Sequence, residues 1–252
     1  RQSRRISRDR CDGQDKTKRD RAGEKRVLCS KEMTERRLPA CDTLMAKQRT
    51  IISNRFASHA DTESHPSVWR TRGYLPHFDD ESTTQFITYR LENSLPRVHL
   101  ERLKQELQAG RISEIEYQRS IENFLDEGHG STHLRNRVIA KIVEENLLKF
   151  DGVKYVLLHW VIMLNHVHIL LKPINGQTLA SIMHSMKSYT ANQANKILCA
   201  SGRFWSVEYF DRYIRDAKHY ASTVNYVHMN PVKARLSREP DGWEFGCARY
   251  HK

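Results

Sequence analysis

No apolar run in this sequence approaches the length of a membrane span, and the arginine-rich start lacks the apolar stretch of a secretory signal. The five cysteines form no CxxC pair and have no spacing typical of a structural zinc site. We therefore expect an intracellular protein with free thiols in a reducing cytoplasm and with no membrane partner.

The sequence has an excess of basic over acidic residues. Its formal net charge is +12, and its mean hydropathy of -0.71 is too low for all 252 residues to form a packed core. Clustered Lys and Arg favour a polyanionic partner, because binding to phosphates releases counterions. Solvated charged faces give the same composition, so charge alone does not establish nucleic-acid binding.

The basic and apolar residues are unevenly distributed along the chain. Residues 1–67 are rich in Arg, Lys, Asp and Ser and show no sustained apolar period, which predicts a disordered basic tail. We expect one folded domain over residues 68–252. A charged, helix-favouring stretch at about 97–125, broken near Gly110, predicts a helical insertion.

The apolar spacing within this domain predicts alternating strands and helices. Strands are expected at Gln85–Leu91, Lys154–Ile162 and Val167–Leu171, and Phe204–Tyr213 is expected to form a last strand or an irregular edge segment. One core-facing helix carries Val138, Ile139, Ile142, Val143 and Leu147, and a second carries Leu179, Ile182, Met183, Met186 and Tyr189. The order is that of an α+β, ferredoxin-like βαββαβ sandwich with an antiparallel sheet, followed by an extra C-terminal helix. In that topology the third strand is central.

His166 and His168 lie two residues apart on this third strand, so both imidazoles project from one face, close enough to share a metal ion. Val167 then points into the core. A hydrogen-bonded pair of structural histidines explains the spacing equally well, so a metal site needs a third ligand.

The C-terminal helix offers candidates for further site residues. Asp216 is the expected N-cap, and Pro231 is expected to end the helix close to Asn230. The apolar stripe, expected to face the core, consists of Ala217, Tyr220, Ala221, Val224 and Val227. A different stripe contains His219, Thr223, Tyr226 and Asn230. Tyr226 is therefore not where core packing would place an aromatic residue, and Asn230 has a carbonyl oxygen for a hard cation.

Several motifs together resemble one family. Asn165–Leu171 (NHVHILL) is similar to the histidine-hydrophobe-histidine signature of HUH endonucleases, and Tyr226–Lys233 (YVHMNPVK) resembles the tyrosine helix of REP-associated tyrosine transposases. Further segments resemble the family in the same order: Gly73–Phe78, Phe204–Trp205, Tyr209–Asp216 and Trp243–Gly246. The resemblance runs from about Arg70 to the end.

The resemblance implies a chemistry as well as a fold. The hydroxyl of Tyr226 would attack a DNA phosphate and form a 5′-phosphotyrosine, and His166, His168 and Asn230 would bind a divalent metal, Mg²⁺ or Mn²⁺. The implied substrate is single-stranded DNA with a hairpin, such as a repetitive extragenic palindrome, in a bacterial, nucleoid-associated setting. His219 is a candidate for helping to deprotonate the tyrosine. Candidate DNA-binding residues are Arg70, Arg72, Lys187, Arg212, Arg215 and Lys233.

Other functions remain open at this stage. A relaxase or replication initiator would use the same chemistry for another task. A catalytically silent regulator would bind the DNA hairpin without cleaving it. A metal hydrolase unrelated to DNA is disfavoured, since the sequence has neither an HExxH helix nor a clear acidic ligand cluster. The oligomeric state, monomer or homodimer, is left open.

Overall fold

The computed structural model describes residues 69–71, 76–78 and 83–250. The expected basic tail, residues 1–67, lies outside the described residues. The strands are β1 (Trp69–Thr71), β2 (Pro76–Phe78), β3 (Gln85–Leu91), β4 (Tyr155–Ile162), β5 (His166–Pro173) and β6 (Trp205–Tyr213). The α-helices are α3 (Arg97–Gln108), α4 (Glu114–Asp126), α5 (Arg137–Lys149), α6 (Leu179–Leu198) and α7 (Ala217–Lys233). Short 3₁₀ helices are η1 (His133–Arg135), η2 (Pro240–Gly242) and η3 (Cys247–Tyr250).

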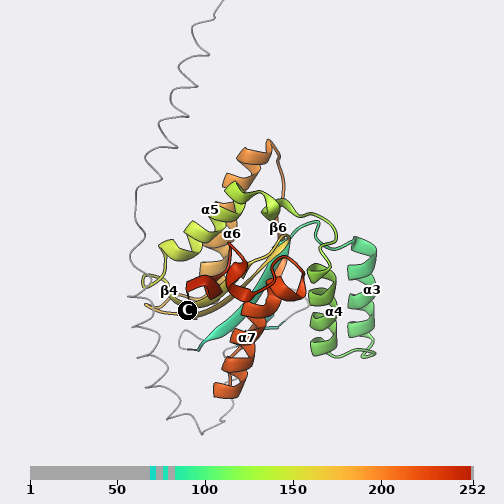
Figure 1. Ribbon diagram of the computed structural model, residues 1–252. Helices are drawn as coiled ribbons and strands as arrows, with labels where there is room; N and C mark the ends of the chain where they lie inside the picture. The colour runs from blue at the N-terminus through green and yellow to red at the C-terminus, as the bar shows by residue number, and fades with distance from the viewer. Residues whose placement is uncertain (1–68, 72–75, 79–82, 251–252) are drawn as a thin grey trace, which may run out of the picture. The chain divides into compact units, whose positions relative to one another are not determined.

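Four strands form an antiparallel sheet in the order β4-β5-β3-β6 (Figure 1). Together with α5 and α6 they follow the chain order βαββαβ, and the first and third strands of that series are the central ones. This is the predicted ferredoxin-like topology, and α7 is the predicted extra helix. β5, which carries the two histidines, is one of the two central strands.

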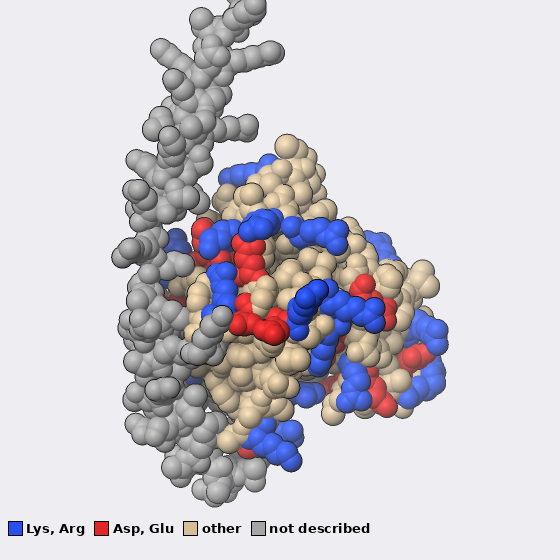
Figure 2. Space-filling model, in the orientation of Figure 1, with Lys and Arg blue, Asp and Glu red and all other residues tan. Residues whose placement is uncertain are grey.

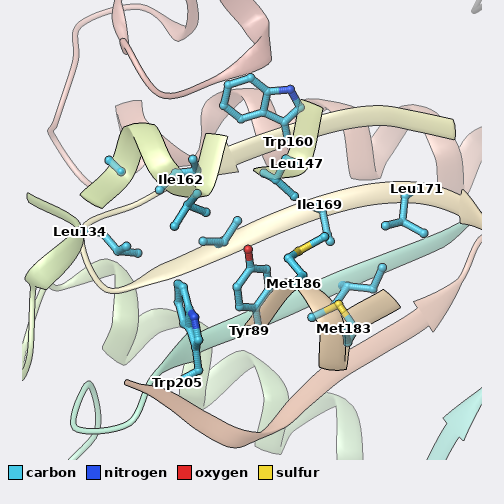
Figure 3. Close-up of a cluster of buried hydrophobic side chains, with 14 of the residues drawn as sticks. Tyr89, Leu134, Leu147, Trp160, Ile162, Ile169, Leu171, Met183, Met186 and Trp205 are labelled. Atoms are coloured by element: carbon cyan, nitrogen blue, oxygen red, sulfur yellow. The ribbon is translucent and has the colours of Figure 1, made fainter. Parts of the chain in front are cut away.

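One face of the sheet packs against α5 and α6. Val167, Ile169 and Leu171 of β5 are fully buried in this layer, as Figure 3 shows for the last two. Because side chains alternate along a strand, the residues between them must face the other way. That second face is covered by α7, whose Val227 packs with Leu170. Both faces of the central strands are therefore buried.

The predicted helical insertion is present as α3 and α4, which lie side by side in Figure 1. A capping box begins α4: Ser113 Oγ accepts from the backbone N–H of Glu116, and the Glu116 carboxylate accepts from the Ser113 N–H. The pair has a small core of its own, which includes Leu103, Tyr117 and Leu125. The insertion is thus a folded element with an apolar and a polar side.

Some details of the predicted helices are wrong. Val138 and Tyr189 are exposed, at 59% and 49%, although their spacing places them with core residues. Helical period predicts the direction of a side chain but not how far the neighbouring layer extends along the helix. Pro231 does not end α7, which continues to Lys233, because a proline in the last turn removes only one N–H donor and the carbonyl of Asn230 still bonds Ala234 N.

β1 and β2 pair antiparallel as a separate two-stranded sheet. Among the described residues, no helix combines the length and the apolar character needed to cross a bilayer.

Helix α5 provides a matched test of the core. Val143→Ala removes two methyl groups that are fully buried against the sheet, and we expect a loss of about 2 kcal/mol in the free energy of unfolding. Val138→Ala makes the same chemical change at an exposed position of the same helix and should change stability by less than about 0.5 kcal/mol. Urea denaturation measures both, and equal losses would contradict the placement of α5.

Candidate functional site

The two histidines lie on the α7 face of β5 and are almost completely buried, with exposures of 1% for His166 and 0% for His168. The imidazole of His168 stacks on Phe86 of β3, with ring centroids 5.5 Å apart. The Nε2 atoms of His166 and His168 are 2.9 Å apart. The prediction that both imidazoles project from one face is confirmed.

Neighbouring polar side chains orient both rings. Asn165 Nδ2 donates to the carbonyls of Leu125 and His129, so its Oδ1 faces His166 Nδ1 at 2.7 Å. An amide oxygen only accepts, so the proton of His166 is on Nδ1 and its Nε2 offers a lone pair. Thr88 Oγ1, opposite His168 in the β3–β5 pairing, lies 2.8 Å from His168 Nδ1. A hydroxyl can donate or accept, and when it accepts from Nδ1–H the lone pair of His168 is on Nε2.

Asn230 of α7 completes this group from the other side. It is fully buried, and its amide nitrogen lies 3.3 Å from His168 Nε2. Its Oδ1 is buried and has no hydrogen-bond partner among the described residues. A 180° turn of the amide exchanges the two atoms and directs this oxygen at the histidines.

The predicted orientation of α7 is therefore wrong in part. Thr223 and Asn230, on the polar stripe, are buried, whereas Ala217 and Ala221, on the apolar stripe, are exposed. The helix turns its polar stripe toward the sheet because the histidine-bearing face that it covers is itself polar. Val227 of the apolar stripe is buried against the sheet, and Tyr220 and Val224 of that stripe pack against the same cluster.

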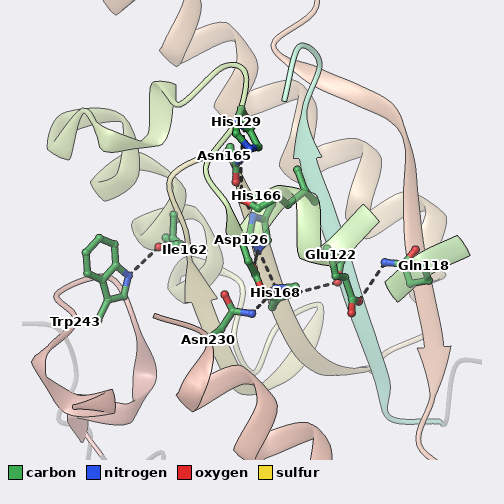
Figure 4. A network of polar contacts seen from close by, with 12 residues as sticks. Gln118, Glu122, Asp126, His129, Ile162, Asn165, His166, His168, Asn230 and Trp243 are labelled. Atoms are coloured by element: carbon green, nitrogen blue, oxygen red, sulfur yellow. Dashed lines mark hydrogen bonds and ion pairs between the residues drawn. The ribbon is translucent and has the colours of Figure 1, made fainter. Parts of the chain in front are cut away.

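The carboxylates at this site were not predicted from the sequence. Asp126, at the end of α4, places Oδ1 3.6 Å from His166 Nε2. One carboxylate oxygen of Asp126 and one ring nitrogen of each histidine all lie within 4.8 Å of one another (Figure 4). Glu122 lies one turn earlier and accepts from Gln118 Nε2 at 3.2 Å. The signal was in the sequence: Gln118, Glu122 and Asp126 are four residues apart and share one side of a helix.

Burial controls the charge of these groups. It lowers the pKa of His166 to about 3 and also lowers the pKa of His168, so both imidazoles are neutral near pH 7, the form that binds metals. Burial, with the nearby charge of Glu122, raises the pKa of Asp126 to about 7. The pKa of Glu122 is also raised, mainly by burial. A cation would favour the charged forms of both carboxyls.

The donor set fits a divalent metal. Two imidazole nitrogens and the carboxylate of Asp126 converge, and the 180° turn of the Asn230 amide adds its oxygen to them. An octahedral ion with bonds of about 2.1 Å needs neighbouring donors about 3 Å apart. The unpartnered oxygens of Asn230 and Asp126 are the stronger observation, because a buried acceptor without a donor is costly. A cation between these oxygens and the histidines removes that cost.

Tyr226 lies directly beside this group. Its ring contacts His168 edge-on, with centroids 5.2 Å apart, and Lys233 Nζ lies 4.8 Å above its centroid. Burial, followed by the charges of Glu122 and Asp126, raises the pKa of the phenol far above its usual value. The hydroxyl is therefore protonated near neutral pH.

A cavity of about 220 Å³ opens next to Tyr226 and is bounded by β3, β6, α4 and α7. Arg212, His219 and Glu122 line it together with the tyrosine. His219 and Arg212 are thus brought to the predicted nucleophile. A second cavity of about 220 Å³ is lined by His166 and Asp126, on the other side of the group.

The other basic residues are placed differently. Lys187 lies on α6, across the sheet from the histidines, and its ammonium donates to the carbonyls of Ser206 and Val207. Arg215 is exposed just before α7. Arg70 belongs to β1, whose side chains are not described, and Arg72 lies outside the described residues.

Comparisons with known proteins give one family. Residues 131–230 match the family described as "Transposase IS200 like", a segment that contains His166, His168, Tyr226 and Asn230 but not α4. This match confirms the resemblance to tyrosine transposases. The chain is also similar to a solved structure of a REP-associated tyrosine transposase bound to a REP hairpin, with 17% identity over 71% of this chain and 84% of that one and a TM-score of 0.48. No curated protein matches.

Thr88→Val tests whether Thr88 sets the tautomer of His168. The exchange keeps the shape of the side chain but removes the acceptor for Nδ1–H, so Nε2 no longer has a fixed lone pair. We expect Mn²⁺ to bind about 10 to 100 times more weakly, measured by titration with the apo protein. Thr88→Ser keeps the hydroxyl and should bind as wild type does. Unchanged affinity in Thr88→Val would show that Thr88 does not set the tautomer of His168.

Proposed function

We propose that this chain, whose residues 131–230 match the IS200-like transposases, is a transposase that cleaves and rejoins single-stranded, hairpin-bearing DNA. The observation that carries the proposal is the convergence of three elements on one buried point. Tyr226 and Asn230 come from α7, His166 and His168 from β5, and Asp126 from α4. A nucleophile beside a set of metal donors is the arrangement that phosphodiester transfer requires.

His166, His168 and Asn230, with Asp126 as an added oxygen ligand, would hold Mg²⁺ or Mn²⁺. When bound, such an ion polarises the scissile phosphate and stabilises the charge that develops on it. Carboxylate and amide oxygens favour these hard cations, and the set contains no sulfur.

Tyr226 would attack phosphorus through its hydroxyl oxygen. The bond from phosphorus to the 3′ oxygen breaks, which leaves a 5′-phosphotyrosine and a free 3′-hydroxyl for later rejoining. The phenol must lose its proton in this step, and its raised pKa means that it needs a nearby acceptor.

Glu122 is the proposed acceptor of that proton. It lines the same cavity as Tyr226, and its charge is the largest electrostatic influence on the phenol after burial. Its own pKa is raised, which brings it closer to the range in which a general base works best. His219 lines this cavity as well and stays an auxiliary candidate.

Basic side chains around the site would bind the DNA backbone. Arg212 lines the Tyr226 cavity, and Lys233 lies over the Tyr226 ring, so both are placed to contact phosphates next to the cleaved bond. Figure 2 shows Lys and Arg spread over the visible face with acidic residues between them, which suits a substrate gripped at several separate phosphates. Lys187, Arg215, Arg70 and Arg72 remain proposed contacts away from the reacting bond.

The substrate proposal follows the similar solved structure, which holds a REP hairpin. A folded hairpin presents a single strand at its foot, where a buried tyrosine can reach one phosphate. The structure describes one copy of the chain, and the proposal works for a monomer or a homodimer.

Tyr226→Phe is the direct test of the nucleophile. Wild-type protein incubated with single-stranded hairpin DNA and Mn²⁺ should give a covalent adduct on a denaturing gel, and Tyr226→Phe should give none, because no oxygen remains to bond phosphorus. Tyr220→Phe and Tyr213→Phe are matched controls that should keep the adduct. Loss of the adduct in a control alone would move the nucleophile, and no adduct with wild type would refute the proposal.

Glu122→Gln tests the proton acceptor. We expect the adduct to form about 10² to 10⁴ times more slowly, with hairpin affinity kept, since the amide cannot take a proton. In wild type the rate should fall as pH drops through the raised pKa of Glu122, because only the carboxylate accepts, and this dependence should be absent in the variant. Glu114→Gln, exposed on the same helix, is the control, and an equal effect there would discount Glu122.

A further inference from the structure

A second group of metal-binding side chains lies on the opposite side of α7 from Tyr226. His159 of β4, His228 of α7 and Cys247 of η3 place one ligand atom each within 4.8 Å of one another. Tyr226 and His228 are two residues apart, which in an α-helix is a rotation of about 200°. The two groups of histidines therefore lie on different sides of α7.

The three distances form a triangle of the size that a tetrahedral zinc ion requires. His159 Nδ1 and His228 Nε2 are 3.1 Å apart, and Cys247 Sγ is 3.8 Å from the first and 3.5 Å from the second. Zinc bonds of about 2.05 Å to nitrogen and about 2.3 Å to sulfur, at tetrahedral angles, give separations of about 3.3 Å for N···N and about 3.6 Å for N···S. The side chains therefore need to move by only tenths of an ångström.

The surroundings orient these donors as outer-shell groups do in zinc sites. Tyr220 Oη lies 3.1 Å from His159 Nε2, so it can accept that N–H and leave the lone pair on Nδ1. The backbone N–H of Trp160 donates to Cys247 Sγ at 3.2 Å, which stabilises a thiolate. His159 and Cys247 are buried, whereas His228 is half-buried.

We infer that His159, His228 and Cys247 form a second metal site, for Zn²⁺, with a water molecule as the fourth ligand. Two imidazoles and a thiolate favour this borderline ion over Mg²⁺ or Mn²⁺, which prefer oxygen. The site shares no residue with the His166–His168 group and does not depend on the proposed function.

The position of the site gives it a mechanical role. It joins β4, α7 and η3, and the segment before η3 is already docked on β4: Trp243 Nε1 donates to the Ile162 carbonyl, and Ile162 N–H donates to the Phe245 carbonyl. Figure 1 shows this C-terminal segment beside α7. A metal here holds the helix that carries Tyr226 against the sheet.

The test uses Co²⁺ as a spectroscopic probe on the full chain, kept reduced and free of other metals. A thiolate bound to Co²⁺ gives a charge-transfer band in the near ultraviolet, which a site with only nitrogen and oxygen ligands does not give. We expect the band in wild type and its loss on addition of Zn²⁺, which binds more tightly. The absence of the band in wild type at saturating Co²⁺ overturns the proposal without reference to any variant.

Variants locate the sulfur. Cys247→Ser should lose the band, and His228→Asn should weaken Co²⁺ binding by more than about tenfold. Cys199→Ser, an exposed cysteine, and His168→Asn, in the other group, should keep the band. A band that persists in Cys247→Ser would place the sulfur ligand on another cysteine and reject the site. If Cys247→Ser does not fold by circular dichroism, His228→Asn decides, and unchanged Co²⁺ affinity in that variant rejects the site.

Discussion

The packing of α7 across the second face of the sheet is the contact on which the site depends. This helix brings Tyr226 and Asn230 to histidines that otherwise would lie on an open face of β5. Val227 is fully buried, and Tyr220, Val224 and Tyr226 of the helix pack against the same cluster, so apolar contacts hold part of the interface. Polar groups make up the rest of it, and their charge state affects its strength.

A buried polar interface of this kind is costly unless its groups are matched. Two imidazoles held neutral by burial, two carboxyls with raised pKa values and an unpartnered amide oxygen all meet within a few ångströms. A divalent cation satisfies them together, since it binds neutral imidazole and charged carboxylate alike. The same reasoning applies on the other side of α7, where a cysteine sulfur and two imidazoles converge. With both proposed ions bound, α7 would be held between them.

The sheet and its central strand were predictable because they depend on local pattern. β-branched and aromatic residues place β3 and β4, and alternation along β5 puts His166 and His168 on the face opposite Val167. The orientation of α7 was not predictable in the same way. A helical wheel assumes that the apolar stripe faces the protein, and that assumption fails where the surface being covered is polar, as Thr223 and Asn230 show.

The sequence by itself determined the secondary structure, the ferredoxin-like order and the pairing of two histidines, because each follows from spacing along a single strand or helix. Only the tertiary structure brought Asp126 to those histidines and Glu122 to Tyr226, since no local pattern encodes the docking of α4. Only the tertiary structure, likewise, joined His159, His228 and Cys247, which are 88 residues apart at their extremes. Ligands from three separate elements have no characteristic spacing in the sequence. The sequence therefore did not indicate that Cys247 lies beside two histidines.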